Sequence, residues 1–198
     1  MIAILDYGAG NLTSVAKAFR YLGAEAQVTA DPVVVEAADS LVLPGVGHFA
    51  STSIISERGL TPAIREAIAK GKPFLGICVG LQWMFEGSEE APGVAGLGCF
   101  AGNCVRFPAD ARVPHVGWNR IQITHTSRLL EGIQNNSFVY YTHSYFAPVV
   151  AQTVAVTEYG APFTAVAEEN NTFAVQFHPE KSSEAGLAML RNFARLAC

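Results

Sequence analysis

Residues 72–82 read KPFLGICVGLQ, an apolar run that passes without a break into residues spaced as in a helix. This pattern predicts a buried strand, a sharp turn and a helix, the repeating unit of an α/β fold. Cys78 occupies the turn between Gly76 and Gly80. A side chain on such a turn projects above the carboxyl edge of the sheet, and flanking glycines remove Cβ atoms that would crowd it. Cys78 is therefore a candidate nucleophile, although a small buried cysteine that ends a strand fits the same letters.

The rest of the chain favours the same class of fold. In the first half, apolar runs at 1–5 and 39–45 alternate with helical segments at 11–23 and 61–71. This order predicts a mainly parallel open sheet flanked by helices, with Asn11 able to cap the first helix. The second half adds β-rich stretches, some of them expected to be antiparallel, at 99–107, 138–147, 152–159, 163–169 and 172–178.

A last helix is predicted after Ser182 or Ser183, either of which can cap it. Its apolar positions recur at helical spacing and should face the sheet, namely Leu187, Leu190, Phe193, Ala194 and Ala197. No repeat, low-complexity tract or linker divides the sequence. We therefore expect a single domain over residues 1–198.

Composition narrows the function classes. Half of the 198 residues are hydrophobic, 15% are charged and the net charge is -4, without a basic cluster that would suit nucleic acid. The N-terminus has neither a basic region nor a long apolar core, so we expect no signal peptide, no membrane span and a cytoplasmic protein. The four cysteines form no CxxC pair, and cysteines and histidines lack paired ligand spacing, so we expect no metal site.

A thiol nucleophile needs a base, and the best placed of the five histidines is His178, in TFAVQFHPEKS at 172–182. Pro179 biases His178 toward an extended conformation, in which residues i and i+2 point to the same side. We therefore expect Glu180 to accept a hydrogen bond from one imidazole nitrogen while the other nitrogen faces the thiol. By itself, the HPE triplet also fits a surface turn.

Two backbone segments are candidate oxyanion donors. The N–H of Val79 begins the helix after Cys78, and LPGVGHF at 43–49 places the N–H groups of Val46 and Gly47 at the same edge of the sheet. Because the glycines also let this peptide rotate the wrong way, one hypothesis about regulation is that the oxyanion hole is poorly formed in the free protein. A plain tight turn would explain these glycines equally well.

Together these segments resemble the class I glutamine amidotransferases, and the resemblance covers nearly the whole chain. It rests on LDYGAGNL (5–12), LPGVGHF (43–49), GICVGLQ (76–82), PHVGWN (114–119), YTHSYF (141–146) and QFHPEKS (176–182). The cysteine and histidine motifs are similar to those of the whole family. The first segment and GWN resemble the glutaminase subunits that work with a (β/α)8-barrel cyclase subunit.

The resemblance implies a flavodoxin-like fold and a glutaminase without a cofactor. Glutamine would be hydrolysed through a thioester, and the ammonia passed to the cyclase to form imidazole glycerol phosphate and AICAR in histidine biosynthesis. The implied triad is Cys78, His178 and Glu180, and the implied glutamine-binding residues are Gly47, Gln82, Glu90, Ser144 and Tyr145. The implied partner interface includes Asn11, Pro114, Trp118, Asn119 and Lys181, whereas Cys99 and Cys104 are expected to be structural.

Without the resemblance, several of these residues have a plainer interpretation. Gln82 and Glu90 read as solvated helix residues, Trp118 as a core aromatic and Lys181 as a surface charge. In that case the motifs would carry no role in binding.

Other functions remain open at this point. The chain could serve anthranilate, aminodeoxychorismate or pyridoxal phosphate synthesis, or be a γ-glutamyl or peptide-cleaving cysteine hydrolase, but GAGN and GWN count against these. Dinucleotide binding after the first strand would need a third glycine where Thr13 stands. A non-catalytic module with a vestigial triad is disfavoured by the intact Cys78, His178 and Glu180.

Overall fold

The computed structural model describes residues 1–196, so the predicted core position Ala197 and the cysteine at 198 lie outside it. The helices are α1 (Leu12–Tyr21), α2 (Pro32–Ala37), α3 (Ser53–Glu57), α4 (Leu60–Ala69), α5 (Val79–Trp83) and α6 (Ser183–Leu196), with 3-10 turns η1 (Phe49–Thr52) and η2 (Pro179–Lys181). The strands are β1 (Ile2–Leu5), β2 (Ala26–Thr29), β3 (Ser40–Gly45), β4 (Phe74–Cys78), β5 (Gly87–Ser88), β6 (Asn103–Arg106), β7 (His115–Arg120), β8 (Gln122–Ile123), β9 (Phe138–His143), β10 (Tyr145–Phe146), β11 (Thr153–Glu158), β12 (Pro162–Glu169) and β13 (Thr172–Val175).

The main sheet of the described chain has the strand order β2-β1-β3-β4-β13-β12-β11-β8. The strands from β2 to β13 run parallel, and β12, β11 and β8 continue the sheet antiparallel. This mixture confirms the predicted fold class. It also shows that β13, from the second half of the chain, lies directly beside β4, so the segments before His178 and Cys78 are neighbours.

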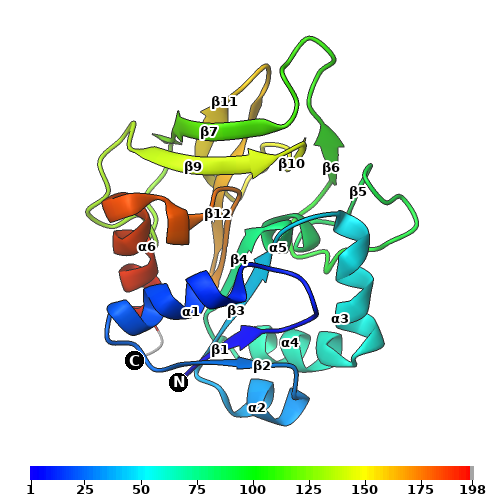
Figure 1. The fold of residues 1–198 in the computed structure, drawn as a ribbon, viewed down its shortest axis with the longest axis vertical. Helices are drawn as coiled ribbons and strands as arrows, with labels where there is room; N and C mark the ends of the chain where they lie inside the picture. The colour runs from blue at the N-terminus through cyan, green and yellow to red at the C-terminus, as the bar shows by residue number, and fades with distance from the viewer. Residues whose placement is uncertain (197–198) are drawn as a thin grey trace.

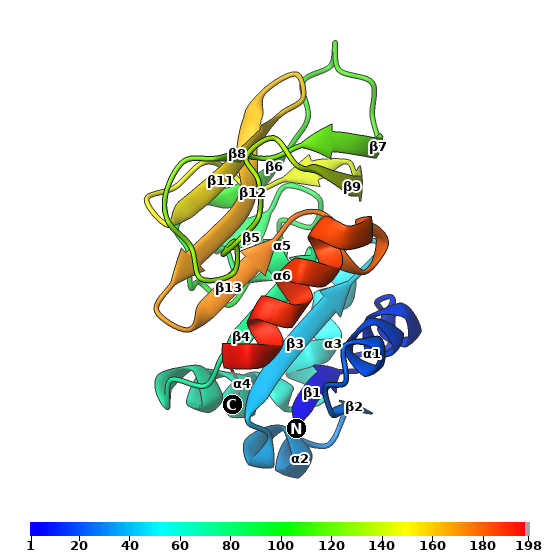
Figure 2. The same cartoon turned by 90° about the vertical axis from the view of Figure 1, so that its left-hand side faces the viewer.

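Helices cover both faces of this sheet (Figures 1 and 2). One face packs against α1 and α6 through residues such as Phe19 and Phe193, whose rings lie 6.4 Å apart. The other face packs against α2, α3 and α4, with Val35, Ile55 and Ile64 in the core. Parallel strands covered in this way expose only their ends, so ligands can reach the sheet at its carboxyl edge.

A small antiparallel sheet of β7 and β9 crosses the top of the molecule in Figure 1. Alternate residues of these strands face opposite sides. The side that we call the outer face carries Val116, Trp118, Arg120, Phe138 and Tyr140. The opposite side of the sheet carries buried residues of β9 and packs on the main core.

Two of the predicted helix starts differ from the expectation. Asn11 stands at the N-cap position of α1, but its side chain makes no capping hydrogen bond. Its amide donates to Glu180 instead, because the start of α1 lies against η2. At α6 the Ser182 carbonyl accepts from the Gly186 N–H, while the Ser182 hydroxyl accepts from the Tyr140 N–H and donates to the His178 carbonyl.

The buried stripe of α6 partly follows the predicted positions. Leu190 and Phe193 are fully buried, whereas Leu187 and Ala194 are only partly covered. Gly186 and Met189 complete the buried stripe.

None of the helices within residues 1–196 has both the length and the apolar composition needed to cross a membrane.

Candidate active site

Cys78 ends β4 in a strained backbone conformation. Its φ of 55° and ψ of -107° lie outside the regions that L-residues normally adopt. The strain fits the sharp strand-to-helix turn predicted from GICVG, although α5 is a short helix that already ends at Trp83.

The two glycines around Cys78 are required by close packing. A Cβ on Gly76 would lie 2.5 Å from the Met84 sulfur, and one on Gly80 would lie 2.0 Å from the Leu43 carbonyl oxygen. Both distances are far below van der Waals contact, so α5 can approach β3 only because these residues lack side chains. The predicted reason for the flanking glycines is therefore confirmed.

His178 and Glu180 form a buried pair. The Nδ1–H of His178 donates to Oε1 of Glu180 at 2.9 Å, with the side chains 1% and 0% exposed. The same carboxylate oxygen accepts from the Asn11 amide at 3.1 Å. The predicted pairing is confirmed, and so is the extended backbone of His178, with a φ of -100° and a ψ of 97°. The chain does not stay extended to Glu180 as predicted, because Pro179 opens the 3-10 turn η2 and this turn brings Glu180 back to His178.

The imidazole of His178 also interacts with Cys78. Burial lowers the pKa of His178, but the charge and hydrogen bond of Cys78 and the hydrogen bond to Glu180 outweigh burial and raise that pKa to about 10. Burial raises the pKa of Glu180, but the hydrogen bond and charge of His178 and the hydrogen bond from Asn11 together outweigh burial and lower that pKa. With Nδ1 bound to Glu180, Nε2 is the nitrogen left for the Cys78 thiol.

The glycine turn after β3 lies beside the cysteine, since Gly45 and Cys78 are register partners. Gly47 has a φ of 94°, which is accessible to glycine at little cost. The Phe49 N–H that follows donates to Oε2 of Glu90 at 2.7 Å, so Glu90 anchors this turn.

A cavity of about 240 Å³ opens beside Cys78. Every residue expected to form the oxyanion hole or to bind glutamine lines it. Its lining residues are Val46, Gly47, Cys78, Val79, Gln82, Glu90, Pro114, Thr142, His143, Ser144 and Tyr145.

Gln82 is not the solvated helix residue that its local pattern suggests. It is 2% exposed, and its Nε2 donates to the Tyr145 carbonyl at 2.7 Å and to Oε1 of Gln176 at 3.4 Å. The Nε2 of Gln176 in turn lies 3.9 Å from the Cys78 sulfur. Sequence reasoning missed Gln176, although its place two residues before His178 was a signal that could have identified it.

Of the five residues expected at a partner interface, Pro114 lines the cavity beside Cys78, and the other four divide into two groups. Trp118 is 52% exposed and stacks edge-on against Tyr140, while the Lys181 ammonium lies 5.9 Å from the Tyr140 ring. These residues surround the outer face of the β7–β9 sheet. Asn119 instead donates to the Glu158 carbonyl, and Asn11 to Glu180, so both side chains also have partners within the chain.

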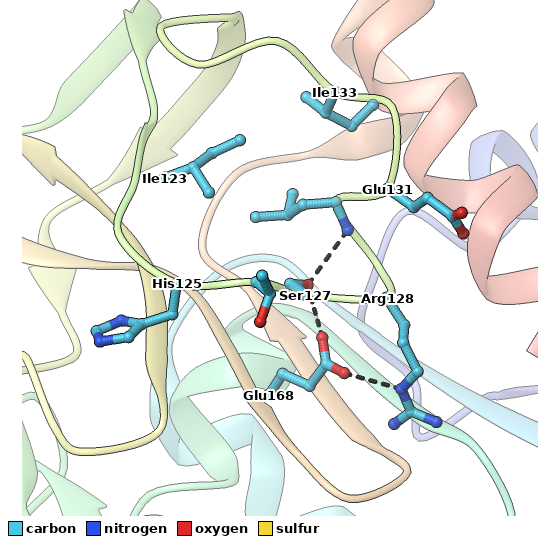
Figure 3. A pocket seen from close by; sticks show the side chains of 9 residues that line it. Ile123, His125, Ser127, Arg128, Glu131, Ile133 and Glu168 are labelled. Carbon is cyan, nitrogen blue, oxygen red and sulfur yellow. Dashed lines mark hydrogen bonds and ion pairs between the residues drawn. The ribbon is translucent and has the colours of Figure 1, made fainter.

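A larger cavity of about 650 Å³ lies elsewhere, beside the loop before residue 133 (Figure 3). Two carboxylates line it, those of Glu131 and Glu168, and Glu168 accepts hydrogen bonds from the Ser127 hydroxyl and from the Arg128 guanidinium, as the figure shows. Arg128 and Glu168 therefore neutralise each other, and this cavity shares no lining residue with the cavity beside Cys78.

Two other cysteines have unreactive surroundings. Burial raises the pKa of Cys99 to about 11 and raises that of Cys104 as well, which keeps both thiols protonated. This agrees with the expected structural role.

Comparisons with known proteins agree with this geometry. A family model described as glutamine amidotransferase class-I matches residues 3–197. The chain is 53% identical to the protein named imidazole glycerol phosphate synthase subunit HisH of Methanothermobacter thermautotrophicus, over 99% of the chain and 98% of that protein. It is 50% identical to the HisH subunit of Thermococcus kodakarensis, over 99% and 100% of the two chains.

A solved structure titled as that of a glutamine amidotransferase superposes with a TM-score of 0.78. It covers 99% of this chain and 98% of that one at 20% identity, a likeness that concerns the fold alone. Taken with the family model and the two relatives, these matches show that the chain belongs to the class I glutamine amidotransferases and, within them, to the family of HisH subunits of imidazole glycerol phosphate synthase.

Proposed function

We propose that this protein is the glutaminase subunit of an imidazole glycerol phosphate synthase, with Cys78, His178 and Glu180 as its catalytic triad. The observation that carries the proposal is the convergence of these three residues at one end of the sheet beside a small cavity. The cavity has a lining that suits glutamine, with a carboxylate, an amide and backbone groups around the Cys78 sulfur.

The reaction begins with the Cys78 thiolate, which attacks the side-chain amide carbon of glutamine. A C–S bond forms and the carbonyl oxygen becomes an oxyanion, to which the backbone N–H of Val79 donates, joined by an N–H of the turn at Val46 and Gly47. His178, charged after taking the thiol proton, gives that proton to the amide nitrogen. The C–N bond then breaks, ammonia departs, and the acyl group remains bound to Cys78 as a thioester.

Water completes the cycle. His178 takes a proton from water as its oxygen attacks the thioester carbon, and the C–S bond breaks to release glutamate. Glu180 keeps the imidazole in the tautomer with the proton on Nδ1, so Nε2 exchanges the catalytic proton in both halves of the reaction.

Glutamine is recognised through its amino-acid end. Because Nε2 of Gln82 is bound by Tyr145 and Gln176, its Oε1 is left to accept from the substrate ammonium. The Glu90 carboxylate adds a negative charge at the same end, and the backbone at Ser144 and Tyr145 supplies contacts to the substrate carboxylate.

The ammonia is expected to pass to a cyclase subunit with a (β/α)8 barrel. Free ammonia is protonated at neutral pH and is then a poor nucleophile, so a direct transfer serves synthesis better than release. The outer face of the β7–β9 sheet, with Lys181 beside it, fits such a partner because it exposes Val116, Trp118 and Phe138 together. We expect the complex to act in the cytoplasm, with residues 1–198 as one domain.

The experiment mixes the full chain with a candidate cyclase subunit and measures glutamate release with and without the cyclase substrate. We expect release to rise when both are present and to be abolished by Cys78→Ala, which should still bind the cyclase. Glutamine hydrolysis retained by the Cys78→Ala variant would contradict the assignment of the nucleophile. Peptide cleavage by the chain alone would instead indicate a cysteine peptidase.

A further inference from the structure

Two buried histidines take no part in the chemistry described above. His115 in β7 and His143 in β9 are register partners on the buried side of the β7–β9 sheet and are 3% and 7% exposed. The Nδ1 atom of His115 lies 3.1 Å from the Nε2 atom of His143. The two rings pack among Phe107, Tyr141, Tyr159 and Phe163.

The hydrogen-bond partners fix which nitrogen of each ring carries the proton. The Nδ1 atom of His143 lies 2.9 Å from the Tyr145 carbonyl, which can only accept, so this Nδ1 carries the proton. In a neutral ring the Nε2 atom is then an acceptor, and the facing Nδ1 atom of His115 has to donate. The Nε2 atom of His115 is in turn an acceptor, and the Asn119 amide lies 3.4 Å from it.

The far end of this chain of hydrogen bonds is fixed in the same way. The Nδ2 atom of Asn119 also lies 3.1 Å from the Glu158 carbonyl, so Asn119 presents its amide hydrogens to both acceptors. Burial keeps the rings neutral, since it lowers the pKa of His115 to about 4 and that of His143 to about 3. The hydrogen bonds therefore all donate in one direction, from the Asn119 amide through the two histidines to the Tyr145 carbonyl.

The Tyr145 end of this series of hydrogen bonds reaches the glutamine cavity. The Tyr145 carbonyl accepts from both His143 and the Nε2 atom of Gln82, at 2.9 and 2.7 Å. A carbonyl held by the imidazole N–H keeps its position for the Gln82 amide, and this contact decides which amide atom of Gln82 faces the cavity. Rotation of the Tyr145 peptide would remove the reason for Gln82 to present Oε1.

We propose that His143 and His115 are positioning residues for glutamine. They hold the Tyr145 carbonyl in place and, through it, fix the orientation of Gln82. They also join this contact to Asn119 in β7. The proposal rests on the proposed glutaminase function and deepens it. It assigns to the side of β7 opposite the outer face a route of polar contacts from Asn119 to the substrate cavity, in addition to the packing of the sheet.

A first test observes the protons directly. The full chain is labelled with ¹⁵N-histidine, and the ring nitrogens of His115 and His143 are assigned by NMR at pH 7.5 with the help of single variants. We expect both rings to be neutral with the proton on Nδ1, which is the minor tautomer of free histidine. A proton on Nε2 in either ring, or a doubly protonated ring, would overturn the proposal whether or not the protein hydrolyses glutamine.

A second test separates positioning from packing by steady-state kinetics of the full chain with its cyclase subunit. His143→Phe keeps a ring but loses the donor to Tyr145, and we expect the KM for glutamine to rise about tenfold with a smaller change in kcat. His143→Asn retains an N–H near the position of Nδ1 and should restore most of the loss. A KM for His143→Phe within twofold of the wild type would reject the role.

Phe163→Leu serves as the matched control. The Phe163 ring packs against both imidazoles but takes no part in the hydrogen bonds from Asn119 to Tyr145. Replacing it with the smaller Leu should therefore lower thermal stability and leave the KM for glutamine unchanged. If Phe163→Leu and His143→Phe raise KM equally, the histidines act only by packing. If the wild-type complex releases no glutamate from glutamine, the proposed function fails, whereas wild-type release with unaffected variants rejects only the positioning role.

Discussion

The amide of Asn11 lies 3.1 Å from Oε1 of Glu180, although 169 positions separate the two residues. That oxygen also accepts from His178 Nδ1, so the residue immediately before α1 orients the carboxylate that orients the proposed catalytic base. Asn11 was expected at the partner interface. Because Asn11 contacts Glu180, a displacement of α1 on docking would change the position of the proposed triad.

Asn11→Ala should lower kcat for glutamine hydrolysis several-fold, because Glu180 loses one donor and gains freedom to turn. Asn11→Asp should be worse, since a second carboxylate beside Glu180 repels it. Initial rates of glutamate release measure both effects. The exposed Lys17→Ala on the same helix is the control, and equal rates for Asn11→Ala and wild type would contradict the prediction.

The turn at Cys78 predicts a strong dependence of stability on Gly80. Gly80→Ala should lower the free energy of unfolding by about 2 kcal/mol or more, because the new Cβ would press against the Leu43 carbonyl. Gly93→Ala is the matched control, since a Cβ there meets nothing within 4 Å and the backbone has no positive φ. Urea unfolding compares the two, and similar midpoints would mean that the turn is not tightly packed.

The outer face predicts where the cyclase binds. Trp118→Ala should weaken the complex at least about tenfold, because a half-exposed tryptophan among other apolar side chains is typical of an interface hot spot. Val33→Ala removes an even more exposed apolar side chain from α2, at the opposite end of the molecule in Figure 1, and should have no effect. Calorimetric titration gives both dissociation constants. Unchanged binding by Trp118→Ala would place the interface elsewhere.

The buried histidine pair predicts a loss of stability in acid. The pKa of His115 falls from its ordinary 6.5 to about 4 in the folded chain because of burial. The folded chain therefore stays neutral at His115 while the unfolded chain takes up a proton as pH falls below 6.5. The stability that His115 contributes is present above pH 6.5 and decreases between pH 6.5 and 4, with a slope of up to about 1.4 kcal/mol per pH unit for each proton.

Unfolding free energies of wild type and His115→Phe, measured from pH 7.5 to 4, test this prediction. The difference between them should move in favour of the variant as pH falls. For Phe163→Leu, which removes no titrating group, the difference from wild type should stay constant. A constant difference for His115→Phe as well would show that the folded chain protonates His115 as easily as the unfolded chain does.

The sequence predicted the parts of the fold and site whose cause is local. The apolar strand and glycines around Cys78 indicated a crowded turn, and the structure shows that both glycines are needed for that reason. The alternation of strands and helices indicated a parallel sheet, and β3 beside β4 places Gly45 against Cys78. His178 and Glu180 were paired correctly, but the 3-10 turn begun by Pro179 was not foreseen.

Contacts between distant segments were not predictable from spacing. Gln82 seemed solvated because its burial depends on Tyr145 and Gln176, which lie 63 and 94 positions away. The local pattern likewise gave Trp118 as a core aromatic, whereas it is half exposed on a sheet that has only one buried side. Asn11 was predicted to cap the helix because no residue near it in the sequence indicates its hydrogen bond to the distant Glu180.

The most direct test of the account is covalent labelling of the wild-type chain with a chloroketone analogue of glutamine, followed by peptide mass spectrometry. Attack by the thiolate forms a C–S bond at the carbon that loses chloride, so the modified residue identifies the nucleophile. We predict a single adduct on Cys78, suppressed by excess glutamine and strongly slowed in His178→Ala. An adduct on Cys99 or Cys104 instead, or labelling of Cys78 that glutamine does not suppress, would contradict the central claim.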